Sequence, residues 1–120
     1  MLDVRRILKD REERRALLER ECERIVAQLR DLGAQKVILF GSVAQGKGST
    51  HSDLDFIVVM PGEEGFAYWS RRLYEEIERR VAVDFLPYSE REFVEIQRHS
   101  RLIRHALRTG KVLYEKKREG

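Results

Sequence analysis

Apolar residues in the first third of the chain recur at helical spacing. One face of a helix is marked by Leu18, Cys22, Ile25, Leu29 and Leu32, which are three or four residues apart. Asp10 and Glu13 have the spacing of a capping box, so we expect this helix to begin near Asp10. Residues 1–9 are then an N-terminal extension, and Gly33 is expected to end the helix.

Short runs of consecutive apolar residues predict buried strands. The main runs are residues 36–40 (KVILF), 54–60 (LDFIVVM) and 81–86 (VAVDFL), and residues 111–114 (KVLY) predict a short edge strand. Pro61 and Pro87 are expected to stop the second and third strands. Because the second run is apolar on both faces, it predicts an internal strand.

Two further helices are predicted between and after these strands. Residues 64–80 place Phe66, Trp69, Leu73 and Ile77 on one face, which is typical of a core stripe, and leave Tyr68 exposed. Ser89 and Glu92 form a capping box that begins another helix, and Gly110 ends it. Its inward face is expected to carry Phe93, Ile96, Ile103 and Leu107.

The predicted order of elements is α-β-loop-β-α-β-α-β. This order indicates an α/β (α+β) fold, in which a small sheet is packed with amphipathic helices. At 120 residues the chain is expected to form a single domain over 1–120, with residues 115–120 as a mobile tail.

Composition narrows the class of protein. Hydrophobic residues make up 42% of the chain, enough for a core, and the net charge of +3 permits an anionic ligand without indicating nucleic acid. The longest apolar run has five residues, so neither a membrane span nor a signal peptide is expected. The single cysteine, Cys22, fits a reducing compartment, and we expect a cytoplasmic protein.

The loop after the first strand resembles a phosphate-binding P-loop only in part. Gly41 to Lys47 match G-x-x-x-x-G-K, but Gly48 stands where a Ser or Thr should bind Mg²⁺. A P-loop also needs a following helix whose amides hold the phosphates, whereas here GSTHSD leads into a strand. The P-loop interpretation is therefore rejected.

Aspartates at the strands predict a metal site. Asp53 and Asp55 are two apart, so they should point to one face, and Asp84 lies within the next apolar run. Buried carboxylates on adjacent strands repel one another, and these strands contain no cationic side chain. A divalent cation such as Mg²⁺ would gather them, although Asp53 taken alone is equally well read as a turn cap. Gly41-Ser42, at the end of the preceding strand, would let backbone amides approach a phosphate.

These motifs together resemble a known superfamily. Gly41-Ser42, ten intervening residues, the D-L-D of residues 53–55 and a later strand bearing Asp84 are similar to the nucleotidyltransferases related to DNA polymerase β. The stretch LFGSVAQGKGSTHSDLDFIVV most resembles the minimal nucleotidyltransferases (MNT), with a core resemblance over about residues 25–86. The resemblance implies a small mixed sheet packed with helices.

The resemblance also implies roles for these residues. Gly41 and Ser42 would hold the triphosphate of a nucleotide, with ATP as the expected substrate, and Asp53 and Asp55 would bind Mg²⁺. Asp84 would be the third carboxylate of a two-metal site and the base for an acceptor hydroxyl. AMP would be transferred to that hydroxyl, on a helical partner of the HEPN type that acts as the toxin of a toxin–antitoxin pair.

One departure leaves an alternative open. Many members of the family have Arg where this chain has Val43 and Gln45. The alternative is therefore a weak or inactive enzyme that neutralises its partner by forming a complex. Transfer to a small molecule or a nucleic-acid end is a third, less favoured hypothesis.

Overall fold

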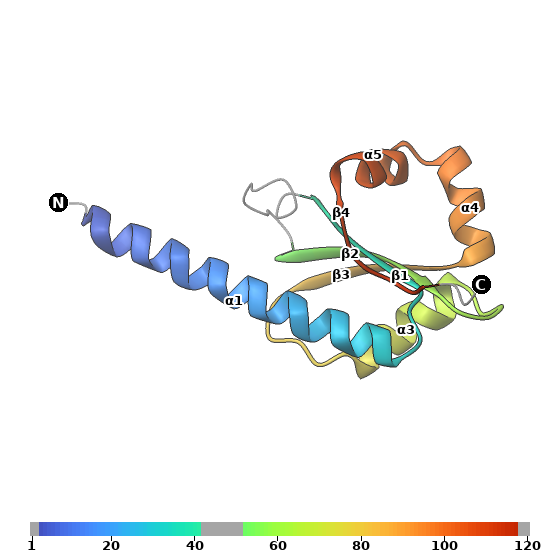
Figure 1. Ribbon diagram of the computed structural model, residues 1–120, viewed down its shortest axis with the longest axis horizontal. Coiled ribbons are helices and arrows are strands. Elements are labelled where there is room, and N and C mark those ends of the chain that lie inside the picture. The colour runs from blue at the N-terminus through green and yellow to red at the C-terminus, as the bar shows by residue number, and fades with distance from the viewer. Residues whose placement is uncertain (1–2, 42–51, 118–120) are drawn as a thin grey trace.

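A four-stranded mixed sheet with helices on both faces forms the protein (Figure 1). The structure is a computed structural model and describes residues 3–41 and 52–117. The strand order is β3-β2-β1-β4. The elements are α1 (Val4–Asp31), β1 (Lys36–Phe40), β2 (Leu54–Met60), α3 (Phe66–Glu76), β3 (Val83–Ser89), α4 (Glu90–His99), α5 (Arg101–Thr109) and β4 (Lys111–Glu115). The predicted fold class is confirmed.

Strand β2 lies inside the sheet, as its apolar sequence predicts. It pairs antiparallel with β1 and parallel with β3, while β1 pairs antiparallel with β4. Helices α1 and α3 cover one face of the sheet, and α4 and α5 lie over the other (Figure 1). The larger core cluster, on the α1–α3 side, includes Ile25, Phe56, Trp69, Leu73 and Phe85, and the smaller one centres on Ile38, Ile57, Ile103 and Ala106.

Helix α1 begins earlier than the sequence predicts. Asp3 is its N-cap and accepts hydrogen bonds from the backbone N–H groups of Arg5 and Arg6, so Asp10 lies inside the helix and caps nothing. The prediction failed because Asp3 is also a good N-cap and no helix breaker separates it from Asp10. The early turns extend beyond the sheet and give the molecule its long axis of 57 Å (Figure 1).

The C-terminal half of α1 follows the prediction closely. The helix ends just before Gly33, which has φ +104°, a value that favours glycine. Cys22 is half-buried against the core, and this burial raises the pKa of its thiol to about 11. Cys22 therefore serves as a packing residue rather than a nucleophile.

Strand β3 continues through Pro87, which was predicted to end it. The strand reaches Ser89, and Pro87 pairs with Val58 of β2. Because β3 is an edge strand with β2 as its only neighbour in the described part of the sheet, proline can leave the free side without a hydrogen-bond donor. Ser89 then forms the predicted capping box with Glu92 and begins α4.

The helices after β2 and β3 are shorter than predicted. Helix α3 ends at Glu76, because Ile77 turns into extended conformation while its side chain stays buried. The last predicted helix is broken at Ser100, whose hydroxyl caps α5 by accepting from the N–H of Ile103. A single serine inside an amphipathic run gives little warning of such a break, since Ser is also tolerated within helices.

The C-terminal segment remains ordered past the predicted edge strand. Glu115 belongs to β4, and the N–H of Lys116 donates to the Gln35 carbonyl at 2.8 Å. The mobile tail expected from residue 115 therefore does not begin there, and residues 118–120 lie outside the described range. Across the residues that the structure describes, no helix is long and apolar enough to cross a membrane.

A buried carboxylate joins α1 to the segment that leads into β3. Glu21 is only 2% exposed, and it accepts from the Arg80 N–H at 2.6 Å and from the Arg24 guanidinium at 2.7 Å. The Arg80 backbone hydrogen bond, followed by Arg24, holds the pKa of Glu21 below its usual value against the opposing effect of burial. Gln28 also bonds both backbone groups of Glu78, each at 2.8 Å. Residues 78–80 are therefore held along α1.

Substituting Glu21→Gln is expected to lower the free energy of unfolding by about 1–3 kcal/mol near pH 7, because a buried charged acceptor of two hydrogen bonds is lost. Since the folded-state pKa is lowered, this contribution is complete above the ordinary value of 4.5 and is lost as pH falls through the folded-state value. Urea unfolding of both proteins at several pH values measures it. Glu23→Gln, at an exposed position of the same helix, is the control. A difference that stays constant down to acid pH would contradict the assignment.

Candidate functional site

Three chain segments place polar groups at the end of the sheet where β1 ends and β2 and β3 begin. This end of the sheet, which carries Asp53, Asp55 and Asp84, is called the carboxylate edge below. The antiparallel pairing of β1 with β2 places Phe40 opposite Asp55, and Gly41 follows Phe40 at the end of β1. The parallel pairing of β2 with β3 places Asp84 directly beside Asp55. Because paired residues in a ladder point to the same face, these two carboxylates share a face of the sheet. The predicted site residues on β2 and β3 are thus neighbours.

Asp55 is a half-buried carboxylate with a strong local constraint. The Ser52 hydroxyl donates to its Oδ1. Burial raises the pKa of Asp55, and the negative charge of Asp84 raises it further, against the opposing effect of Ser52. Asp84 itself is exposed, which differs from the expectation that its apolar strand would bury it. The edge position of β3 explains this exposure.

Asp53 lies in the bend before β2 and is bound by two other segments. Its Oδ2 accepts from the Ala82 N–H at 3.0 Å, and its own N–H donates to the Ala82 carbonyl at 2.8 Å. Its Oδ1 accepts from the guanidinium of Arg14 on α1. Asp53 therefore caps the turn through Ala82, and this role is compatible with its predicted role as a metal ligand. Nothing in the sequence distinguishes Arg14 from the other arginines of its helix, so this contact could not be predicted from the sequence.

Gly41 makes a close approach that only glycine allows. Its φ is +79°, and a Cβ at this position would lie 2.5 Å from Oδ2 of Asp55. The backbone at the end of β1 therefore lies directly against a carboxylate of the candidate site. Ser42, the other residue predicted to hold phosphate, lies outside the described residues.

The donors at this edge suit a hard divalent cation. Within residues 3–41 and 52–117, Asp55 and Asp84 have no ion pair with a lysine, arginine or histidine. Oxygen ligands from neighbouring carboxylates are those that Mg²⁺ prefers. Among the described residues, no group of three or more acidic, His or Cys side chains is gathered closely enough to hold a metal ion, and Asp53 pairs with Arg14. The chemistry fits, and the three-carboxylate site stays a prediction.

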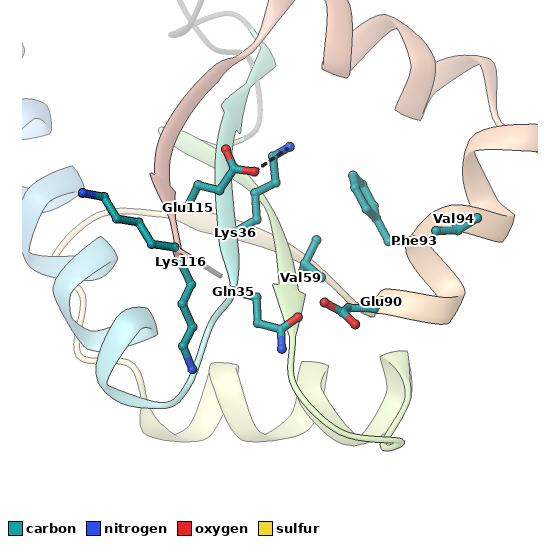
Figure 2. A pocket seen from close by; sticks show the side chains of 9 residues that line it. Gln35, Lys36, Val59, Glu90, Phe93, Val94, Glu115 and Lys116 are labelled. Carbon is teal, nitrogen blue, oxygen red and sulfur yellow. Dashed lines mark ion pairs between the residues drawn. The ribbon is translucent and has the colours of Figure 1, made fainter. Parts of the chain in front are cut away.

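A separate hollow lies at the opposite end of the sheet. Figure 2 shows this hollow, whose volume is about 600 Å³, beside Lys36, Val59 and Phe93. Lys36 pairs with Val59 at one end of the β1–β2 ladder, whereas Phe40 pairs with Asp55 at the other. The hollow therefore does not belong to the carboxylate edge.

Gly41→Ala is expected to destabilise the protein by about 2–4 kcal/mol, because a strained backbone and a contact with Asp55 add together. Gly62→Ala is the matched control: its φ is +78°, but an added Cβ would meet nothing within 4 Å. Gly62→Ala should therefore lose only about 1–2 kcal/mol. Denaturant unfolding measures both variants, and equal losses would show that the contact with Asp55 has no effect.

The chain was compared with protein families, curated proteins and solved structures. The family model described as "Polymerase beta, Nucleotidyltransferase" matches residues 23–119. A solved structure described as "Crystal structure of the toxin-antitoxin with AMP-PNP" is similar, with 24% identity over 79% of this chain and 73% of that chain and a TM-score of 0.49. No curated protein matches the chain. The match to the family model extends over most of the chain and includes β1, β2 and β3, so the protein belongs to the polymerase beta nucleotidyltransferase family.

Proposed function

We propose that the protein is a Mg²⁺-dependent nucleotidyltransferase that transfers AMP from ATP to a hydroxyl group. The observation that carries the proposal is the register of Asp55 with Asp84, at the edge where Asp53 and Gly41 also lie. Family membership supports the reaction class, and the oxygen donors suit the metal that accompanies a nucleoside triphosphate.

Each residue of the site has a role in this proposal. Gly41 and Ser42 bind the triphosphate through backbone amides and a hydroxyl, because a residue without a side chain lets phosphate oxygens approach the backbone. Asp53, Asp55 and Asp84 hold Mg²⁺, which when bound neutralises charge on the phosphates and on the leaving group. The narrow space between Gly41 and Asp55 keeps the phosphate-binding backbone beside the metal ligands.

The transfer is a single displacement at the α-phosphorus. The acceptor oxygen forms a bond to that phosphorus while the bond to the bridging oxygen breaks, and pyrophosphate leaves with the bonding electrons. Asp84 accepts the proton of the acceptor hydroxyl, since it is exposed at the sheet edge and an acceptor can reach it. Alignment of the reacting groups supplies much of the rate.

The proposed acceptor is a hydroxyl on a helical HEPN-type partner, with this chain as the antitoxin. The support is the resemblance of residues 39–59 to the minimal nucleotidyltransferases. The exposed apolar side chains of Val4 and Leu8, on the part of α1 that extends past the sheet, offer such a partner a surface. The alternative, neutralisation by binding alone, is favoured by Val43 and Gln45, which replace arginines common in the family and lie outside the described residues.

Asp53→Asn and Asp55→Asn are each expected to reduce transfer of label from [α-³²P]ATP to the co-purified partner by at least about 100-fold, because one charge of the metal site is lost. Asp31→Asn, an exposed change of the same kind in α1, should leave transfer unchanged. Label from [γ-³²P]ATP should not appear on the partner, since pyrophosphate leaves.

The same assay separates enzyme from binding module. If the wild-type protein neutralises its partner while no α-label reaches any protein, nucleic acid or small molecule, the transferase proposal is wrong. If transfer occurs and the Asn variants keep full activity, the reaction is right and the residue assignment is wrong.

A further inference from the structure

Arg14 connects the long first helix to the candidate site. Its guanidinium donates to Oδ1 of Asp53, a residue 39 positions away in the sequence. The Arg14 side chain is 59% exposed, whereas that of Asp53 is only 24% exposed. Among the described residues, Arg14 is the only one whose cationic group pairs with any of the three aspartates. The proposed function leaves this contact unexplained.

The contact with Arg14 occupies part of the Asp53 carboxylate that a metal ion would also use. Oδ2 of Asp53 accepts from the Ala82 N–H at 3.0 Å and Oδ1 accepts from Arg14, so a metal ion at either oxygen would share the carboxylate with Arg14. A guanidinium and a divalent ion on the same carboxylate would repel each other strongly at such short range. Binding of metal by Asp53 and pairing of Asp53 with Arg14 therefore compete with each other.

A displaced Arg14 would remain beside the site. The helix is anchored by Ile25 and Leu29 in the core and by the hydrogen bonds of Glu21 and Gln28 to residues 78–80. The backbone of Arg14 is thus held near the carboxylate edge, and its guanidinium stays within reach of a ligand there whether or not it pairs with Asp53. Its planar group of donors matches phosphate oxygens well, better than the ammonium group of lysine does.

We propose that Arg14 exchanges partners: it neutralises Asp53 in the free protein and binds the β- or γ-phosphate of the nucleotide when Mg²⁺ takes its place. This inference rests on the proposed function, and it adds a phosphate-binding residue from a helix outside the carboxylate strands. Arg14 then opposes binding of metal alone and favours binding of metal together with triphosphate. The site is thereby selective for the metal–triphosphate complex.

Calorimetry on the full chain tests this exchange with defined probes. Arg14→Ala should bind MgCl₂ alone about threefold to tenfold more tightly than wild type, because the competing cation is gone. It should bind Mg²⁺ with the non-hydrolysable analogue AMP-PNP about tenfold or more weakly, because charge-assisted hydrogen bonds to phosphate are lost. Its affinity for AMP, which lacks the outer phosphates, should change less than about twofold. Arg14→Lys should fall between wild type and Arg14→Ala.

Arg15→Ala is the matched control, since it removes the same charge from the neighbouring exposed position, where Arg15 pairs only with Glu19 in the described residues. It should leave all three affinities near those of wild type. Thermal unfolding of both variants should stay close to wild type, because exposed ion pairs add little stability.

Two results would overturn the inference while leaving the proposed function intact. One is equal affinity of wild type and Arg14→Ala for both MgCl₂ and Mg²⁺–AMP-PNP. The other is an equal loss of affinity for Mg²⁺–AMP-PNP in Arg14→Ala and Arg15→Ala, which would show that only the net charge of the protein matters. A wild-type protein that binds neither Mg²⁺ nor the triphosphate at millimolar concentration would overturn the proposed function and the inference together.

Discussion

The register of β2 with its two neighbours is the constraint on which the site depends. Because β3 runs parallel to β2, both strands begin at the same edge, and Asp55 and Asp84 become partners. Because β1 runs antiparallel to β2, it ends at that edge and delivers Gly41. A slip of one residue in either ladder would turn the carboxylates to the opposite face and the apolar residues away from the core. The buried residues on both faces of β2 thus fix the positions of Asp55 and of the residues beside it.

Helix α1 joins the core, the approach to β3 and the carboxylate edge. Its C-terminal half contributes Ile25 and Leu29 to the larger cluster, and its middle holds residues 78–80 through Glu21 and Gln28. Those residues lead directly to Ala82, whose N–H binds Asp53. The part of the helix beyond the sheet carries Arg14 to the other oxygen of the same carboxylate. One helix therefore influences Asp53 from two directions.

The structure confirms the sequence predictions where a pattern depends on burial. All the predicted strands exist, β2 is internal, and Trp69 and Leu73 of α3 face the core. The errors fall where one polar residue or proline had two compatible roles. Asp3 and Asp10 were both suitable caps, Pro87 is acceptable on an edge strand, and Ser100 both interrupts one helix and caps the next. Only the position of each in the sheet or the layer of helices decides between the roles.

The sequence by itself determined the order of the elements and the apolar strands, because periodicity and local turn preferences act between near neighbours. It also showed that a glycine-containing turn precedes the strands that carry the aspartates. Only the tertiary structure decided which strands pair and in which direction, that Asp84 is exposed, and that the Gly41 backbone touches Asp55. It also decided that Arg14 reaches Asp53. These contacts join residues far apart in the chain, and their geometry follows from the packing of α1 and the ladder register, which no short stretch of sequence encodes.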